Sequence, residues 1–454
     1  MTMNERCWTT ILIPLVCASS AWAQQDQGND QANSPAPQTM LPDTRPLSGI
    51  ETLGLGSMAG ERSYVSPGFL VAQTAQSNAQ FEPGGHPGFG AATILGGNVG
   101  LESLGRRNQF SLAYQGGGIL YETNSVSNST YQLLGFSDSL SFRRATFTLT
   151  DRFSYLPGFY GGLGAFAYGG ALSLNGLGTL PGLNSGLNPQ RGILTNAAGY
   201  SNVGLAQMEY MPGARSSITV AAGLQNLDSS QQGFSSFNAI TAQAGYNRNL
   251  TAKDTVAVYY LLRLFHYTGT SEDLDSQVLS FSYGRRVTDR LALQLFAGPE
   301  FFAITVPGHT QTSTTGYGGV GLTYRWPRTQ LGVDYFKGIS GGSGALNGAN
   351  TNSVTMTISR QLSTKWSGDL GFGYNHNSSL PRPGSAPVQQ TYNYWHGTCS
   401  VTRTLGQHSR VILFYSFQTQ NSNHPFSLGG SPGKSVLNNI FGVNFSYTFR
   451  PIGI

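Results

Sequence analysis

The sequence predicts an all-β chain, a transmembrane antiparallel up-and-down β-barrel of about eighteen strands, with sixteen as the alternative count. Three observations predict this fold. Only 10% of the 454 residues are charged, against roughly 25% in an ordinary soluble domain, while 60 are glycine and 11% are aromatic. Between about residues 65 and 450, apolar and polar residues alternate with a period of two, as in strands with unlike faces. The connections between these segments are alternately short and long.

The composition also excludes several classes. A mean hydropathy of −0.17 excludes a bundle of apolar transmembrane helices, and the aromatic content excludes a disordered chain. The net charge is only +5, lysine is scarce, and the arginines are scattered along the chain. We therefore expect no nucleic-acid partner.

Residues 1–23 have the layout of a cleaved signal peptide. Arg6 is the basic end, Ile11–Ala18 is a short apolar core, and Ala21-Trp22-Ala23 is a small-x-small cleavage site. Cleavage would leave Cys399 as the only cysteine, so no internal disulfide is expected. Residues 24–64, rich in Gln, Asn and Pro, are predicted to be a linker, and residues 65–454 the barrel.

The final strand shows the alternation most clearly. Its apolar face carries Phe441, Val443, Phe445, Tyr447 and Phe449, and its other face is polar or glycine. The same pattern recurs in the segments 218–225, 291–301, 320–326, 366–375 and 411–418. A soluble sandwich also alternates, so the alternation alone does not decide the fold.

The connection lengths and the aromatic residues favour the membrane barrel. Short turns are expected near 102–106, 142–144, 211–216, 247–254, 286–290, 326–329, 361–365 and 404–408. Longer polar segments are expected near 76–90, 122–128, 155–200, 227–234, 268–275, 305–314, 340–351, 377–390 and 420–437. Short turns on one side, long loops on the other, and aromatics near the strand ends are typical of an outer-membrane barrel. The count requires a first strand near Gly68–Ser77.

On these residues the chain resembles the porin-like outer-membrane β-barrel proteins of Gram-negative bacteria, without a motif of any one porin family. Such barrels usually end on an aromatic residue that the assembly machinery recognises; here Phe449 is the equivalent, and Arg450–Ile454 follow it. The resemblance implies location in the outer membrane, contact with its lipid and lipopolysaccharide, and insertion by the barrel assembly machinery. It also implies that residues 24–64 lie in the periplasm. Porins are often trimers, so a homo-oligomer is compatible with it.

The resemblance and the strand count together predict the function. A barrel of 16 to 18 strands leaves an aqueous lumen. We expect a channel for passive diffusion of small hydrophilic solutes, anionic or sugar-like, without energy input. The alternative is the exit barrel of a system that exports a polysaccharide or another polymer, with the N-terminal linker touching a partner.

A phospholipase-like barrel enzyme is the least favoured reading. His376 and Ser378 lie two residues apart on one strand face, but no third catalytic group is identifiable, so no enzymatic activity is expected. The histidines show no His-x-x-x-His metal spacing, and no metal or cofactor is expected.

The polar strand faces place eight charged side chains in the lumen as candidates for a constriction: Arg152, Arg263, Arg325, Arg410, Glu209, Glu300, Asp334 and Asp369. An arginine facing lipid at mid-span would cost about 2–4 kcal/mol, which favours the lumen for Arg263. These groups either select solutes by charge or pair with one another and hydrate the lumen. Asp138 and Asp151 have the parity of the lipid face, which implies a bulge or a position beyond the hydrocarbon.

The segment 155–200 is the longest expected loop, rich in Gly, Leu and Asn and almost uncharged. We expect it to fold into or over the lumen and narrow it; the alternatives are an external cap or an extra hairpin.

Overall fold

The computed structural model describes residues 47–50, 63–78, 89–122, 127–156, 199–229, 236–342, 346–382, 389–426 and 433–454. The predicted signal peptide, most of the predicted linker and nearly all of the loop 155–200 lie outside these residues, so those assignments stay predictions. Among the described residues there is no helix long and apolar enough to cross a membrane.

Eighteen long strands and one short terminal strand form a single antiparallel sheet. Their bounds are β1 Tyr64–Gln76, β2 Gly90–Leu104, β3 Asn108–Tyr121, β4 Ser129–Ser141, β5 Ala145–Leu156, β6 Gly199–Gly213, β7 Ser216–Ser229, β8 Ser236–Asn249, β9 Asp254–Thr268, β10 Glu272–Arg286, β11 Leu291–Val306, β12 His309–Trp326, β13 Thr329–Gly342, β14 Asn347–Gln361, β15 Trp366–Ser379, β16 Thr391–Thr404, β17 Ser409–Phe426, β18 Gly433–Thr448 and β19 Ile452–Gly453.

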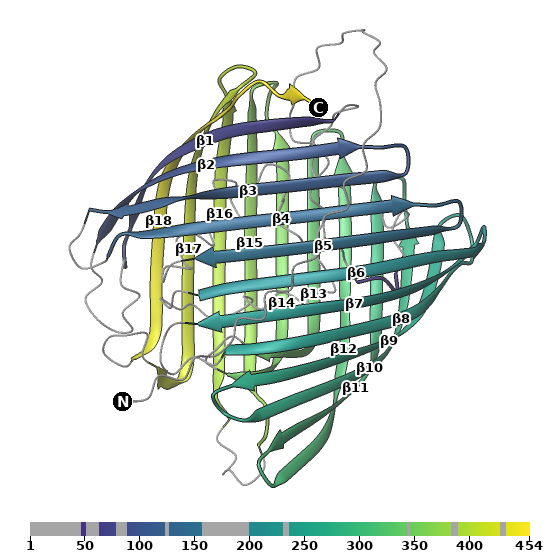
Figure 1. Cartoon of the computed structure of the whole chain (residues 1–454). Coiled ribbons are helices and arrows are strands. Elements are labelled where there is room, and N and C mark those ends of the chain that lie inside the picture. The colour runs from purple at the N-terminus through teal and green to yellow at the C-terminus, as the bar shows by residue number, and fades with distance from the viewer. Residues whose placement is uncertain are drawn as a thin grey trace, which may run out of the picture. The chain divides into compact units, whose positions relative to one another are not determined.

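The sheet closes on itself. Each strand pairs with its neighbours in the chain, and β18 returns to β1, from Gly68 opposite Thr448 to Gln76 opposite Ile440. The two-residue β19 continues this seam by pairing with Tyr64 and Val65. In Figure 1 the strands nearer the viewer cross those behind at a steep angle, as the tilted strands of a closed barrel do. The predicted eighteen-stranded up-and-down barrel is therefore confirmed, and its first strand begins at Tyr64 rather than Gly68.

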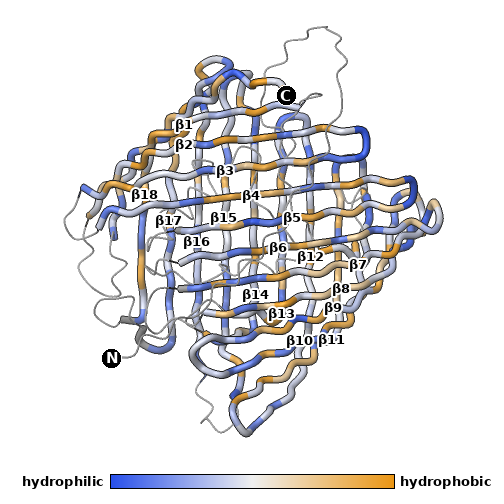
Figure 2. Tube along the Cα trace, in the orientation of Figure 1, coloured by the Kyte–Doolittle hydropathy of each residue, from blue (hydrophilic) through white to orange (hydrophobic). Residues whose placement is uncertain are grey.

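The outer face of the barrel is apolar. On β9, Val258 and Tyr260 are 40% and 45% exposed, whereas Tyr259 between them is 1% exposed and faces the interior. Figure 2 shows the resulting alternation of apolar and polar residues along the strands. Outward residues of the other strands include Val71, Leu95, Tyr114, Val220, Leu224, Ile240, Phe281, Phe301, Leu370, Leu413 and Phe441. A closed barrel with such a belt satisfies its backbone groups internally and presents apolar surface to lipid, so it spans a membrane.

The eight short turns lie where the sequence predicts them, at one end of the barrel. They occupy residues 105–107, 142–144, 214–215, 250–253, 287–290, 327–328, 362–365 and 405–408. We call this the short-turn end.

The opposite end differs from the prediction at four connections. β17 ends at Phe426 and β18 begins at Gly433, both inside the predicted loop 420–437. Residues 269–271 and 307–308 are tight turns instead of long loops, and β13 and β14 together extend from Thr329 to Gln361 with a gap of only 343–346. The reason is that these strand ends, such as His309–Thr315, are polar on both faces and so lack the alternation that marks a strand inside lipid.

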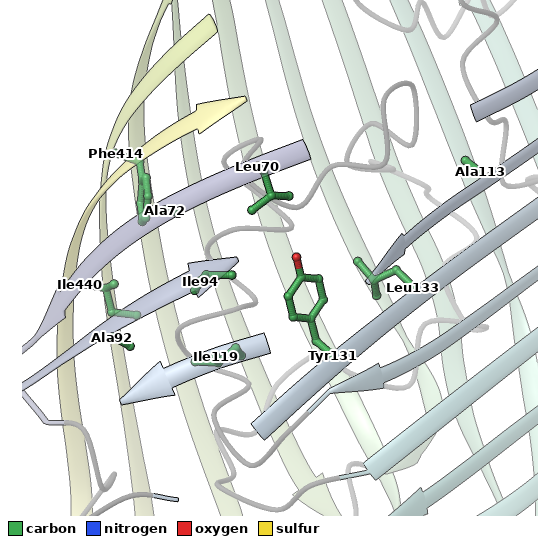
Figure 3. Packing of buried hydrophobic residues seen from close by; sticks show 10 residues of the cluster. All are labelled: Leu70, Ala72, Ala92, Ile94, Ala113, Ile119, Tyr131, Leu133, Phe414 and Ile440. Carbon is green, nitrogen blue, oxygen red and sulfur yellow. The ribbon is translucent and has the colours of Figure 1, made fainter. Parts of the chain in front are cut away.

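Part of the inner wall is apolar as well. Figure 3 shows ten buried residues that come together on the inner side of β1–β4, β17 and β18: Leu70, Ala72, Ala92, Ile94, Ala113, Ile119, Tyr131, Leu133, Phe414 and Ile440. The hydroxyl of Tyr131 lies over Gly96, where a Cβ would collide with it. This packing stiffens the wall on both sides of the closing seam.

Candidate functional site: the barrel lumen

The wall opens between β12 and β13 at the end opposite the short turns. The two strands pair only from Trp326 with Thr329 to Gly318 with Lys337. Beyond that point β12 remains paired with β11 as far as His309, and β13 remains paired with β14 as far as Gly342. The described tip of the β13–β14 hairpin, residues 338–342 and 346–350, thus separates from β12, while Ala349 and Asn350 stay paired with β15; we call it the inner hairpin.

The inner hairpin turns into the lumen. Ile339 has the strand parity of Tyr335, which is 38% exposed on the outer face, yet Ile339 is completely buried. Ile339 packs with Leu380 against inward side chains of β8–β11. These side chains are Phe237, Phe265, Tyr267, Leu274, Phe302 and Ile304. Tyr267 Oη donates a 2.8 Å hydrogen bond to the carbonyl of Gly341, and Asn347 Nδ2 donates one of 2.7 Å to Glu272 Oε2. The hairpin therefore occupies part of the cross-section, against the β8–β11 wall.

Glycine makes this close packing feasible. A Cβ on Gly341 would lie 2.7 Å from Phe265 Cε1, and one on Gly348 would lie 2.7 Å from Leu274 Cδ2. Gly348 also has a φ of +77°, which side chains rarely adopt. The small residues of this segment thus have a structural cause, because the hairpin backbone lies directly on aromatic and leucine side chains.

Glu300 anchors the inner hairpin at the point where it separates from β12. The amide of Ile339, just beyond the last β12–β13 pair, donates a 2.9 Å hydrogen bond to Glu300 Oε2. Glu300 Oε1 accepts a 2.6 Å hydrogen bond from Ser276 Oγ and forms an ion pair with Arg263 Nη2. The guanidinium of Arg263 also lies 6.0 Å from the ring centre of Tyr317. Glu300 and Arg263 are 0% and 1% exposed, so their charges are directed at each other within the packed wall.

Of the eight predicted lumen charges, the structure joins Arg263 and Glu300 in an ion pair. The other six have inward strand parity and are spread over six strands. Arg325, Arg410 and Asp369 lie close to the short-turn end, where Arg410 Nε donates a 2.8 Å hydrogen bond to Ser446 Oγ. Arg152, Glu209 and Asp334 lie further along their strands. These six candidates therefore start from different heights of the inner wall.

Asp138 and Asp151 face outward, as their parity predicts. The pairings of β4 with β5 and of β5 with β6 run without a register shift through the described residues, so no bulge redirects them. Asn202 Nδ2 donates to both oxygens of Asp151, at 3.1 and 3.3 Å. The outward carboxylate of Asp151 on β5 is thus hydrogen-bonded by the side-chain amide of Asn202 on β6.

The inner face of β14–β18 is largely polar and nearly uncharged, apart from the apolar residues Ile412, Phe414, Val436 and Ile440 of β17 and β18. One row of cross-strand partners runs Thr355, Gly373, His396, Gln418, Asn438. Further inward residues of these strands are Thr351, Ser353, Thr357, Ser359, Asn375, Asn377, Thr398, Ser400, Ser416, Gln420 and Asn444. Many are enclosed: Asn438 is 0% and Gln418 3% exposed. We call this surface the neutral wall; its hydroxyl and amide groups can both donate and accept hydrogen bonds.

The His376–Ser378 pair does not form a nucleophile and base. His376 Nδ1 lies 2.7 Å from Asn393 Oδ1, and Ser378 Oγ donates a weak 3.4 Å hydrogen bond to the carbonyl of Asn350. Both residues have the outward parity of β15, so they do not face the lumen. A catalytic serine requires a base in hydrogen-bond contact, which this geometry does not supply. Within the described ranges there is also no cluster of three or more potential metal ligands.

Four residues of the predicted linker lie inside the barrel. Leu47–Ile50 contact the inner face of β6, β7, β8 and β10, and all four are buried. Neither this contact nor the inner hairpin follows from strand periodicity. The sequence signals are two apolar residues, Leu47 and Ile50, in a largely polar segment, and an excess of small residues after Lys337.

Comparison with known proteins finds distant similarities to solved structures. No protein-family model and no curated protein matches the chain. Among solved structures, Pseudomonas aeruginosa OpdQ is 11% identical, with a TM-score of 0.41 over 86% of this chain and 99% of that one. Pseudomonas aeruginosa OccK2 (OpdF) is 9% identical, with a TM-score of 0.44 over 85% and 98%. The FrpB iron transporter from Neisseria meningitidis is 7% identical, with a TM-score of 0.41 over 86% and 83%.

Proposed function

We propose that this chain is an outer-membrane channel through which small hydrophilic solutes diffuse passively. The observation that carries the proposal is the neutral wall, a five-strand inner surface rich in hydroxyl and amide groups within a barrel whose outer face is apolar. A solute that loses water on entering can exchange its hydrogen bonds with such a surface. A barrel of this strand number is wide enough to hold a hydrated path beside inward-folded segments.

The outer membrane is the location that this architecture supports. Closed antiparallel barrels with an apolar belt and short turns at one end are typical of that membrane, with the short turns in the periplasm. Both chain ends of the barrel, Tyr64 and Thr448, lie at the short-turn end. We therefore place the short-turn end in the periplasm.

The solute class follows from the chemistry of the neutral wall. Its charged neighbours, Asp369 and Arg410, are close to the short-turn end, and the most enclosed pair, Arg263 with Glu300, is internally neutralised. Hydroxyl and amide groups can replace the hydrogen bonds that a neutral polyhydroxylated molecule makes with water. Because they are uncharged, they discriminate little between solutes of different charge. We propose uncharged, sugar-sized solutes, and the enclosure of the wall implies a narrow pore.

Liposome swelling tests the proposal. Vesicles containing the refolded protein are mixed with isotonic sugars of increasing size, and the initial swelling rate is recorded beside protein-free vesicles. Swelling with monosaccharides that declines for larger sugars is the expected result. No swelling with any sugar, together with no conductance in planar bilayers, would contradict a channel.

Two adjacent residues of β16 provide matched variants. Thr398 faces the lumen and Cys399 faces outward. Thr398→Trp should slow swelling because the indole projects into the path, and Cys399→Trp should leave the rate unchanged because it adds an aromatic group on the lipid side. Equal rates for the two variants would show that solutes do not pass along the neutral wall.

A further inference from the structure

The segment Leu47–Ile50 occupies a fitted site on the inner wall. It forms a turn that lies near the short-turn ends of β7, β8 and β10 and reaches β6. Ser48 is 0%, Ile50 4% and Leu47 5% exposed, so this segment before the first strand is tied down by its burial. We call these four residues the inner tether.

Ser48 is the polar centre of the contact. Its amide donates a 2.8 Å hydrogen bond to Asn247 Oδ1, and its carbonyl accepts from Gln243 Nε2 at 2.5 Å and from Thr219 Oγ1 at 3.1 Å. Its hydroxyl accepts a 2.7 Å hydrogen bond from Asn247 Nδ2 and also contacts the Thr219 hydroxyl. Every polar group of Ser48 therefore has a wall partner, although it is fully buried.

Apolar contacts complete the site on both sides of Ser48. Leu47 lies over Gly284, where a Cβ would be 3.2 Å from Leu47 Cδ2. Ile50 packs with Leu205 and Ala221. Gly245 forms the floor under Ser48, because a Cβ there would lie 2.8 Å from Ser48 Oγ. The wall thus has small residues where the inner tether needs space and amide or hydroxyl groups where it needs partners.

We propose that the inner tether is a resident ligand of the β6–β10 wall and that it narrows the pore near the short-turn end. The occupant is this chain's own peptide, recognised through one serine between two apolar side chains. The docking stands on the contacts above, whereas the narrowing also rests on the proposed channel function.

A disulfide tests the docking without any assumption about transport. In a Cys399→Ser background, Ser48→Cys is combined with Thr219→Cys, whose hydroxyls are in contact in the native protein. The matched control combines Ser48→Cys with Ser416→Cys, which is also buried on the inner face but on β17. After oxidation of the folded protein in vesicles, the first pair should form a loop that migrates faster in denaturing gels without reductant, and the second should not. Absence of the loop in the first pair, or equal loops in both pairs, would overturn the docking.

Single-channel conductance tests the narrowing. Residues 47–50 are replaced by Gly-Ser-Gly-Ser, which keeps the chain length, and residues 37–40 receive the same replacement as a control. The first variant should conduct at least about twofold more than the parent, the second should equal it, and the oxidised Ser48–Thr219 pair should stay at the parent value.

The outcomes separate the proposals. Unchanged conductance in the first variant, with the disulfide formed, overturns the narrowing and leaves the docking established. Absence of conductance in every variant, with the disulfide formed, refutes the channel function and with it the narrowing, while the docking again stands.

Discussion

Replacing Glu300 with alanine should strongly destabilise the barrel and release the inner hairpin. The variant loses three contacts at once: the ion pair with Arg263, the hydrogen bond from Ser276, and the hydrogen bond from the Ile339 amide. Leaving a buried charge without its partner costs about 3–5 kcal/mol. An unsatisfied buried amide adds about 1–3 kcal/mol, so the free energy of unfolding should fall by about 4–8 kcal/mol.

The assay is a urea titration of the protein refolded into vesicles, followed by tryptophan fluorescence, with conductance measured in parallel. Two further variants divide the effect. Glu300→Gln keeps an acceptor for Ile339 and should cost less than alanine. Arg263→Met combined with Glu300→Gln removes both charges and should cost less than the sum of the single variants, because no unpaired charge remains.

The reasoning would be refuted by a loss of less than about 1 kcal/mol in the alanine variant, since a buried pair cannot then be present. Additive single-variant costs would equally show that the two side chains do not interact. An increase in conductance should accompany destabilisation, because the inner hairpin loses its anchor at the point where it separates from β12.

Three other predictions concern packing and orientation. Gly341→Leu should displace the inner hairpin from Phe265, cost about 1–3 kcal/mol in the urea titration and raise conductance; an unchanged titration would contradict the close packing. Phe281→Arg, at an outward position that is 60% exposed, should cost about 2–4 kcal/mol in vesicles, whereas Phe281→Leu should be nearly neutral; equal costs would mean that this face does not contact lipid. Cys399 should resist a membrane-impermeant maleimide when the protein is folded in vesicles, and should react after unfolding. The control, Ser363→Cys in a Cys399→Ser background, lies in an exposed turn and should react in both states. Rapid labelling of Cys399 in the folded protein would contradict its outward position.

The strands can be predicted from the sequence because successive residues face lipid and lumen in turn, which favours alternating apolar and polar side chains. Parity alone placed Arg263 on the inner face, and the structure agrees. Parity does not specify a partner, since Glu300 lies 37 residues away on a strand that is not adjacent to β9. The pair is set by the curvature of the wall and by the hairpin packed over it, and neither is encoded in local alternation.

The same limit explains the missed features at the end opposite the short turns. His309–Thr315 is polar on both faces, so it looks like a loop although it pairs with Glu300–Val306. The segment 340–351 is expected to be a loop, but Ala349 within it is buried in a strand because the hairpin turns inward. The docking of Ser48 depends on residues 171 to 199 positions later in the chain. Such complementarity becomes visible only once the strands are assembled.

The pairing of β1 with β18 constrains the order in which the strands of this barrel can pair. The first strand acquires its second neighbour only when Gly68 meets Thr448, almost at the end of the chain. Until then both edge strands carry unpaired amides and carbonyls, which cost free energy in lipid. Closing the sheet also lowers the conformational entropy of the chain between the two edges. Pairing of the last strand is therefore the step that satisfies these backbone groups, and a chain that stops short of Asn444 would lack about half of the seam pairs.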